Sequence, residues 1–322
     1  LEILVTRSEK HLRETVRTEG AGRPLLVAAG GDSTMTIMAE ELLPLLHPPR
    51  IGFVGLGSSN DLALAFGIDG LQRSLDALAG GRSLPIDVGE VVVGGERRGV
   101  FLGQVNAGIG VEVNLAVERW AAKRSILRRL QTLPGFLEIW RAFSCQTVPL
   151  PLFVESRNRK SEGEYAVALF SNTRFWASGR RVNPDADPCD GLLDLCLIEA
   201  DSPLSFLKVA VRTGSGKHLG RKGVIAYRSE SFTLSSGRGF SLQCDGEVLR
   251  EGGRPLLLKE AEIRLLPGAL EMIVPSLLMN SPVCGHLLPG LPEDLRSVQV
   301  VRTSLDADST AFAVCVFLGK SL

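Results

Sequence analysis

The sequence has no C-x-x-C pair among its six cysteines, no apolar run approaching the ~20 residues of a membrane span, and no net charge. Its scattered cysteines disfavour a zinc or redox site and are typical of reduced thiols in the cytosol. A chain without net charge has no overall field that would draw it to nucleic acid. No signal peptide is visible, so we expect a cytoplasmic protein. Attraction to a membrane would have to come from a local patch of its surface.

A pattern of strand, glycine turn and helix occurs twice between residues 25 and 68. The first copy has these three parts at residues 25–29, 30–34 and 35–46, and the second has them at 51–54, 55–61 and from 62 onward. Turns that follow parallel strands lie at one edge of the sheet, and this is the edge where α/β proteins bind phosphates. The repeated pattern therefore predicts a phosphate site.

The first turn reads Gly30-Gly31-Asp32-Ser33-Thr34. Glycine lets the backbone come close to a ligand, because no Cβ intervenes. Ser33 and Thr34 can cap the following helix or offer hydroxyls to a phosphate at its positive end. Asp32 would repel a phosphate unless a cation bridges them or its carboxylate accepts a hydrogen bond from a ribose or a backbone N–H. For either turn alone, an ordinary strand-to-helix connection is the plain alternative.

From Pro85 onward the sequence has the pattern of short strands. We expect a hairpin over 88–102 and further strands near 150–155, 165–172, 192–199, 224–228, 231–235 and 240–244. Helices are expected over 112–145, with a break at Pro134-Gly135, and over 202–211. A βαβ region followed by a run of strands predicts an α/β domain at 1–86 and a β-sandwich at 87–267. Residues 268–322 form a C-terminal segment whose packing this pattern leaves open.

Six segments in chain order carry a family resemblance. Residues 30–34 resemble the GGDGT signature of the diacylglycerol kinase catalytic family, which includes bacterial soluble lipid kinases and sphingosine kinases. The other five segments resemble later motifs of that family and stand at 55–61, 83–89, 101–113, 183–198 and 245–247. The resemblance covers about residues 1–275. It implies a Rossmann-like α/β nucleotide-binding domain, as in phosphofructokinase and NAD kinase, and a β-sandwich lipid-binding domain.

The resemblance implies an ATP-dependent lipid kinase that uses Mg²⁺ and phosphorylates the hydroxyl of diacylglycerol or a related lipid. The expected nucleotide-binding residues are Thr6, Gly30, Gly31, Asp32, Ser33, Thr34, Gly57, Ser58 and Asn60. The expected metal-site residues are Asp61 and Asp87 in an acidic network, and Asp187, Asp190 and Leu192 around a structural Mg²⁺. A helix-entry hydroxyl at Thr6 and ordinary aspartate turns are the alternatives.

A lipid hydroxyl also needs a proton acceptor. Asp245-Gly246-Glu247 matches the DGE motif of the family, which implies that Glu247 is the acceptor and that Asp245 belongs to the metal network. In an extended segment, Asp245 and Glu247 would point to one face. Both are therefore candidate catalytic residues.

The glycine turns depart from the family pattern at four positions: Ser33, Gly55, Ser58 and Ser59. The Cβ of Ser33 is expected to narrow the first turn, so that Ser33→Gly should be tolerated or activating. The family's first strand, with its N-P-x-x-G loop, is absent from the sequence, which opens with the pattern of the second strand. Either residues that precede Leu1 supply this strand, or the protein is a diverged member. The departures at Ser33, Gly55 and Ser59 make a catalytically impaired lipid-binding homologue the alternative function. NAD kinase shares the GGDG turn, but the later motifs argue against it.

Basic residues gather within the expected helix 112–145, at Arg119, Lys123, Arg124, Arg128 and Arg129. A basic helix with Trp140 nearby suits an anionic membrane surface. A solvated face is the alternative. The expected partners are thus a lipid substrate and a peripheral membrane surface, with no nucleic acid. A glycine-rich basic loop at 212–222 could meet a nucleotide or lipid phosphate, or could simply be solvated.

The segment 311–318 is almost wholly apolar, too short for a membrane span and too apolar for an exposed edge. It is expected to form a buried strand. One hypothesis places this strand in the sheet of the nucleotide domain, within the chain or in a neighbour. The alternative adds it to the β-domain or to a partner there, as in a homodimer.

Overall fold

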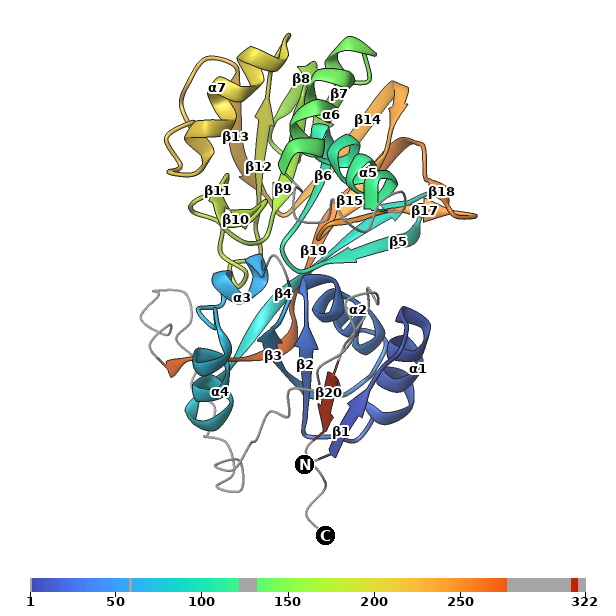
Figure 1. The fold of residues 1–322 in the computed structure, drawn as a ribbon, viewed down its shortest axis with the longest axis vertical. Coiled ribbons are helices and arrows are strands. Elements are labelled where there is room, and N and C mark those ends of the chain that lie inside the picture. Colours follow the sequence, from blue (N-terminus) through green and yellow to red (C-terminus); the bar gives the residue numbers. More distant parts are fainter. Residues whose placement is uncertain (1, 58–59, 122–131, 277–313, 318–322) are drawn as a thin grey trace. The chain divides into compact units, whose positions relative to one another are not determined.

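The computed structural model describes residues 2–57, 60–121, 132–276 and 314–317 (Figure 1). The chain forms two compact units, which we call unit 1 (Leu1–Val88 with Pro267–Leu322) and unit 2 (Gly89–Leu266). Two long strands, β4 (Arg82–Val93) and β19 (Leu258–Val274), carry the chain out of unit 1 and back into it.

The sheet of unit 1 has the strand order β1-β20-β2-β3-β19. Its strands are β1 (Glu2–Val5), β20 (Val314–Phe317), β2 (Leu25–Gly30), β3 (Arg50–Gly55) and the end of β19. β2 and β3 are parallel and level with each other, from Leu25 opposite Arg50 to Gly30 opposite Gly55. β19 joins β3 in parallel. Two neighbouring parallel strands therefore end at the same height, each in a glycine.

The C-terminal strand β20 lies between β1 and β2 and is antiparallel to both. Of the two hypotheses for the apolar segment 311–318, this is the one that places it in the sheet of the nucleotide domain. Residues 276–292 and 298–303 of the tail, for which an extended wrap and a strand were also expected, lie outside the described residues from 277 onward.

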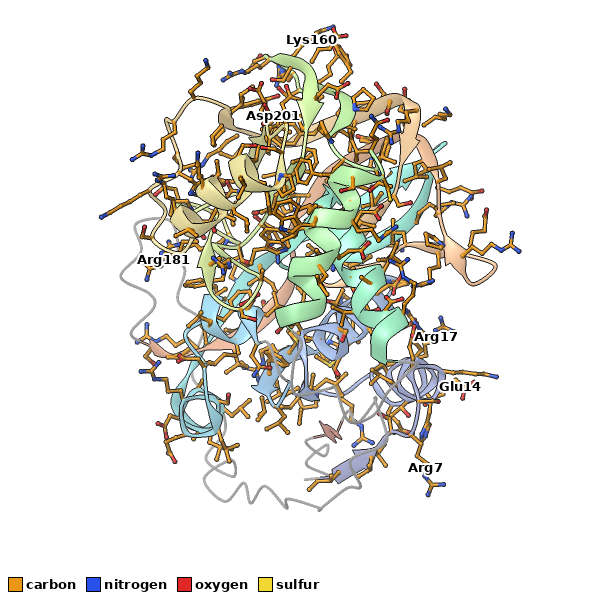
Figure 2. All side chains as sticks on the ribbon, turned by 45° about the horizontal axis from the view of Figure 1, so that its top comes forward. Arg7, Glu14, Arg17, Lys160, Arg181 and Asp201 are labelled. Atoms are coloured by element: carbon orange, nitrogen blue, oxygen red, sulfur yellow. The ribbon has the colours of Figure 1, made fainter. Side chains whose placement is uncertain are left out.

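Four helices accompany this sheet: α1 (Glu9–Glu19), α2 (Asp32–Leu42), α3 (Asp61–Ala65) and α4 (Leu71–Gly80). Ser8 caps α1 and accepts a hydrogen bond from His11 N at 3.1 Å. Arg13 and Arg17 of α1 (Arg17 is labelled in Figure 2) both contact Glu41 of α2, with Arg13 Nη1 at 2.7 Å from its carboxylate. Burial opposes ionisation, but the two guanidiniums hold the pKa of Glu41 below its ordinary value. The pair fastens α1 to α2.

Unit 2 is built from two sheets. One has the order β19-β14-β7-β8, with β4 paired to β19 and β5, and the other has the order β13-β12-β9-β6-β15-β16. The strands of the first sheet are β5 (Glu96–Phe101), β7 (Leu150–Glu155), β8 (Lys160–Tyr165) and β14 (Ser231–Phe240). Those of the second are β6 (Gln104–Gly108), β9 (Val167–Ser171), β12 (Leu193–Ile198), β13 (Val224–Ser229), β15 (Leu242–Cys244) and β16 (Glu247–Val248).

The central strands of the second sheet are buried on both faces. Along β12, Leu193, Leu195 and Leu197 enter the core shared with the first sheet. Cys196 and Ile198 point to the opposite side, where α6 and α7 pack. This alternation follows from the two-residue period of a strand. The second sheet is therefore the middle layer between the first sheet and the helices.

The helices of unit 2 are α5 (Ile109–Ala121), α6 (Thr132–Ser144) and α7 (Pro203–Thr213). Two short ribbons complete the unit: β10 (Phe175–Trp176) with β11 (Arg180–Arg181), and β17 (Arg250–Glu251) with β18 (Arg254–Pro255). The expected break at Pro134-Gly135 is wrong, because α6 already begins at Thr132. A proline in the first turn of a helix loses no intrahelical hydrogen bond. No described helix is both long and apolar enough to cross a membrane.

The expected fold class, an α/β domain followed by a β-sandwich, is confirmed. Its expected local elements also appear, including the hairpin of β4 and β5 about Gly94-Gly95, both with positive φ. The family resemblance also implies a closing strand at residues 270–275, and the structure shows this to be the end of the 17-residue β19. Its first half belongs to unit 2, and the polar residues of that half made the full length of the strand hard to recognise from the sequence.

Candidate active site

The two glycine turns of unit 1 touch each other. A Cβ added to Gly57 would come within 2.7 Å of the Cα of Gly31, and one added to Gly30 would meet the Thr34 hydroxyl at 2.5 Å. Leu56 N donates to the Gly30 carbonyl at 2.7 Å, which extends the strand pairing into the turns. Gly31 has φ −89°, a value open to any residue. Glycine is therefore needed here for the close approach of two backbones and not for a left-handed conformation.

Asp32 fastens the second turn to the first. Its carboxylate accepts hydrogen bonds from Asp61 N at 2.9 Å and from Leu62 N at 3.3 Å, and these are the first two residues of α3. The carboxylate thereby caps a helix 29 residues further along the chain. Of the alternatives for Asp32, acceptance from a backbone N–H is the one observed.

The N-terminus of α2, which is the positive end of the helix dipole, lies in the first glycine turn. The helix begins at Asp32 after Gly31, with no side-chain cap on Gly31. Ser33 is the second residue of the helix, so the expectation that its Cβ narrows the turn is wrong. Thr34 packs its side chain against Gly30. Ser58 and Ser59 lie outside the described residues, so the expected role of Ser58 stays a prediction.

The other expected residues of unit 1 have the following places. Asn60 closes its own turn, because its amide accepts from Gly57 N and donates to the Gly57 carbonyl, both at 3.0 Å. Thr6 is buried directly after β1. Asp87 is buried on β4 and accepts a hydrogen bond from Gly268 N at 2.8 Å, beside β19. Direct contacts thus join five of the expected residues: Gly31, Asp32, Gly57, Asn60 and Asp61. Asp87 links β4 to β19, the strands by which the chain leaves unit 1 and returns to it.

The DGE motif in unit 2 is a tight hairpin turn. β15 ends at Cys244 and β16 starts at Glu247, so Asp245 and Gly246 form a two-residue loop with φ +42° and +94°. Asp-Gly is a preferred pair for such a turn, because both residues tolerate positive φ. The expectation of an extended segment with Asp245 and Glu247 on one face is therefore wrong. Glu247 is exposed at the start of the return strand.

The carboxylate of Asp245 accepts three backbone hydrogen bonds. They come from Leu102 N at 2.6 Å, Gly103 N at 2.9 Å and Gln104 N at 2.8 Å. Asn172 binds a carbonyl group of the same turn: its side-chain amide donates to the Leu102 carbonyl at 2.8 Å. Asp245 thus shapes the turn between β5 and β6. Asn172 escaped the sequence reasoning, although a polar residue that ends a fully buried strand is a usable signal.

A polar layer runs from the same turn along β6 and β15, and sequence reasoning missed it. Asn106 is buried and donates to the Gln243 side chain at 3.1 Å. The side-chain oxygens of Gln104 and Asn106 are buried with no hydrogen-bond partner in the described part of the chain. From α5, Asn114 donates to the carbonyl of Gly246 in the hairpin turn. The turn that carries Glu247 is therefore anchored on both sides.

Asp187 and Asp190 form a compact turn before β12. Asp187 accepts a hydrogen bond from Cys189 N at 3.1 Å, and Asp190 accepts one from Leu192 N at 3.0 Å. Burial, together with the neighbouring Asp187, raises the pKa of Asp190. Asp194, whose carboxylate is 2.8 Å from Arg228 Nε, has its pKa raised to about 6 by burial. Arg228 also pairs with Asp190 at 3.7 Å, and its positive charge only partly offsets the effect of burial on the two carboxylates. Within the described residues, no group of three histidine, cysteine, aspartate or glutamate side chains is placed to hold a metal.

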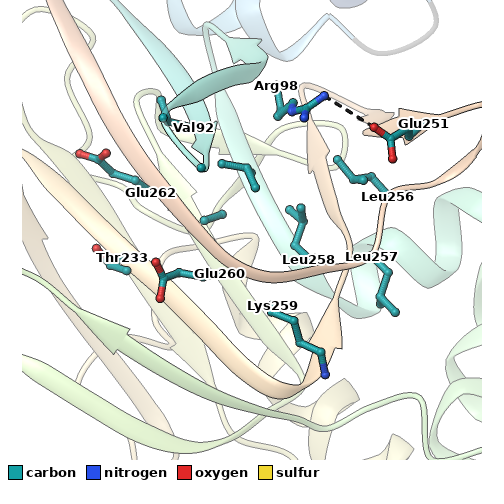
Figure 3. Close-up of a pocket in the computed structure, with 14 residues that line it drawn as sticks. Val92, Arg98, Thr233, Glu251, Leu256, Leu257, Leu258, Lys259, Glu260 and Glu262 are labelled. Carbon is teal, nitrogen blue, oxygen red and sulfur yellow. Dashed lines mark ion pairs between the residues drawn. The ribbon is translucent and has the colours of Figure 1, made fainter.

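An open groove of about 580 Å³ lies in unit 2, between the β4–β5 hairpin and β19. Its wall includes Leu256, Leu257 and Leu258, and the ion pair of Arg98 with Glu251, 3.7 Å apart, stands at its edge (Figure 3). None of the residues expected at the active site lines it.

Comparison with known proteins decides the family. Residues 1–91 match the model of the diacylglycerol kinase catalytic domain, and residues 103–274 match that of the YegS C-terminal NAD kinase beta sandwich-like domain. The chain belongs to the diacylglycerol kinase family of lipid kinases. Both glycine turns fall within the catalytic-domain match. The Asp187–Asp190 turn and the DGE hairpin fall within the sandwich match.

Individual relatives of this family are distant. The chain is 25% identical over 225 residues to "Diacylglycerol kinase" of Bacillus subtilis, covering 69% of this chain and 71% of that protein. It is 27% identical to "Probable lipid kinase YegS-like" of Pseudomonas aeruginosa over 280 residues, 86% of this chain and 85% of the relative. A crystal structure of a diacylglycerol kinase from Bacillus anthracis matches with a TM-score of 0.58 at 15% identity, covering 84% of each chain. That likeness shows the fold alone.

Proposed function

We propose that this lipid kinase transfers the γ-phosphate of ATP to the hydroxyl of diacylglycerol or a related lipid. The observation that carries the proposal is the contact of the two glycine turns beside the N-terminus of α2. Backbone N–H groups at a helix N-terminus attract phosphate. The missing Cβ atoms let the second turn pack directly against the first at this helix end. The phosphates of ATP would bind there, while Asp32 holds the two turns in register.

Glu247 is the residue we propose as proton acceptor. It is exposed on a rigid hairpin whose turn is held through Asp245 and Asn114. A carboxylate that is positioned without flexibility can accept the hydroxyl proton as the new bond to phosphorus forms. Asp245 acts differently in this proposal, because its carboxylate is engaged by three backbone N–H groups. It positions the hairpin and is not the base.

Mg²⁺ fits the Asp187–Asp190 turn. The donors are carboxylate and carbonyl oxygens, which are the ligands Mg²⁺ prefers. Burial and, to a smaller extent, the neighbouring Asp187 raise the pKa of Asp190, and a cation bound there would favour the charged carboxylate. Asp190 would hold the metal through its carboxylate, with main-chain carbonyls of Asp187 and Leu192. Mg²⁺ bound with ATP neutralises charge on the transferring phosphoryl group. A thermal shift on adding Mg²⁺ that is lost in Asp190→Asn tests the structural site without an activity assay.

The activity test is a screen with radiolabelled ATP. Diacylglycerol, sphingoid bases, ceramide, polyprenols and NAD serve as separate acceptors. We expect label in a lipid product with the wild type, none with Glu247→Gln, and wild-type label with Glu230→Gln, an exposed glutamate of the same unit. Label on NAD alone would support an NAD kinase instead. Lipid binding without label on any acceptor would support the impaired homologue. Equal rates for Glu247→Gln and wild type would remove Glu247 as the base.

A further inference from the structure

Helix α7 exposes apolar side chains on the face that should be polar. Its inner face packs normally, with Phe206 in the core cluster beside the second sheet and Thr213 buried. On the opposite face, Leu204 is 60% exposed and Val211 is 76% exposed. They are seven residues apart, two helical turns, so they share one stripe with the exposed Lys208 between them. A surface helix of a globular protein normally carries polar residues there.

Positive charge surrounds this stripe. Residues 202–229 contain no aspartate or glutamate. The exposed basic residues on α7 and in the loop after it are Lys208, Arg212, Lys217, Arg221 and Lys222. The β10–β11 ribbon adds Arg180 and Arg181, and Arg180 is held against the last turn of α7 by its hydrogen bond to the Ala210 carbonyl at 3.1 Å. Arg212 and Arg221 likewise donate to main-chain carbonyls, so these contacts leave their charge in place.

Exposed acidic side chains also lie near this surface. The Glu199 carboxylate lies beside Gly223, and Asp185 follows Pro184, which lies against Gly216. Glu199 and Asp201 are exposed just before α7. Hydrogen bonds from Ser205 and Ser202 lower the pKa of Asp201, so this residue keeps its negative charge. Asp201 and Arg181 are labelled near the first and last turns of α7 in Figure 2. Basic side chains nevertheless outnumber these three carboxylates on α7, the loop after it and the β10–β11 ribbon.

We propose that the outer face of α7, together with loop 214–222, docks on an anionic lipid bilayer. Leu204 and Val211 would enter the boundary between headgroups and acyl chains while the surrounding cations meet lipid phosphates. Apolar residues amid Lys and Arg are the pattern of helices that lie in a membrane interface. Nucleic acid is less suited as an occupant, because its sugar–phosphate backbone offers no apolar layer for leucine and valine. Of the basic residues expected to face a membrane, Lys123, Arg124, Arg128 and Arg129 lie outside the described residues, so that expectation stays a prediction. The role of the α7 surface does not require that the protein be an active kinase.

The test is co-sedimentation of the full chain with vesicles of phosphatidylglycerol and phosphatidylcholine in equal parts, and with phosphatidylcholine alone. We expect binding to the anionic vesicles that weakens with salt. Lys217→Gln with Lys222→Gln should weaken partition about thirtyfold at low salt, since each basic residue near an anionic surface contributes about fivefold. Leu204→Gln with Val211→Gln should also reduce binding, and the remaining binding should be more sensitive to salt.

Matched controls come from unit 1. Leu46→Gln removes another exposed leucine, and Arg7→Gln with Lys10→Gln removes two exposed charges of the β1–α1 region (Figure 2). These should bind vesicles as the wild type does, and thermal unfolding should show that the α7 variants remain folded. The proposal is overturned if α7 variants sediment like the wild type, if controls weaken binding equally, or if the wild type binds duplex DNA and not vesicles. Phosphorylation of a short-chain, water-soluble diacylglycerol reports on the kinase separately, because it needs no bilayer.

Discussion

Replacing Asp245 and Glu247 in turn separates a positioning carboxylate from a catalytic one. Both Asp245→Asn and Glu247→Gln are expected to lower turnover by at least ~10²-fold while ATP still binds. For Glu247→Gln this is the usual effect of losing a positioned base. For Asp245→Asn the reason is indirect, because the hairpin that positions Glu247 loses part of its support. Their effects on stability should differ. Asp245 holds three backbone N–H groups of residues 102–104, whereas Glu247 is exposed.

The magnitude for Asp245→Asn follows from those contacts. Asparagine tolerates the positive φ of position 245, so the turn itself can remain. Its one acceptor oxygen can keep the bonds from Gly103 and Gln104, although without the charge. The N–H of Leu102 would then face an amide NH₂ and lose its partner. A lost charge-assisted hydrogen bond and a buried donor without a partner together cost about 3 kcal/mol. Glu247→Gln, at an exposed position, should change the free energy of unfolding by less than about 0.5 kcal/mol.

Urea unfolding of both variants, with hydrogen exchange of amides 102–104, measures this difference. We expect faster exchange at these three amides in Asp245→Asn and unchanged exchange in Glu247→Gln. The reasoning is refuted if Asp245→Asn unfolds at the wild-type urea concentration, or if Glu247→Gln is the less stable variant. Full turnover in either variant would show that its carboxylate is not needed for the reaction.

Three further predictions concern stability. Burial raises the pKa of Asp194 to about 6 in the folded chain, so the folded state binds an extra proton, and the free energy of unfolding should fall by roughly 2 kcal/mol as pH rises from 4 to 6. Loss of this slope in Asp194→Asn would confirm its source, and the same slope in that variant would contradict it. Ser33→Gly should lower the free energy of unfolding by about 0.5 kcal/mol, because Ser33 lies inside α2 and glycine is a poorer helix former than serine. A variant that is more stable in urea unfolding would argue against this placement. Deleting residues 310–322 removes β20 from between β1 and β2. This should lower the free energy of unfolding by at least about 3 kcal/mol, at about 1 kcal/mol for each main-chain hydrogen bond lost. Deleting only residues 318–322 should leave thermal unfolding unchanged.

Local pattern was enough to predict the elements that build the site. Apolar runs of strand length that end in glycine identified β2 and β3, and the motif series identified the family and the order of its two domains. These features depend on neighbouring residues, so a sequence reader can find them. The hairpin about Gly94-Gly95 and the helix capped by Ser8 were predictable for the same reason.

Contacts between distant residues needed the tertiary structure. The sequence left open whether Asp32 meets a cation, a ribose or a backbone N–H, and the structure shows that its carboxylate caps a helix that begins 29 residues later. The spacing of Asp245 and Glu247 suggested one catalytic face, but positive φ at Asp245 and Gly246 turns the chain back, and three amides from another strand engage Asp245. The amphipathic pattern could place α7 on the surface, but only packing showed which of its apolar residues remain exposed. The sequence by itself determined the local elements and the family, because short-range preferences encode them. The partner of each polar group was decided by the fold, because it depends on which strands and turns come together.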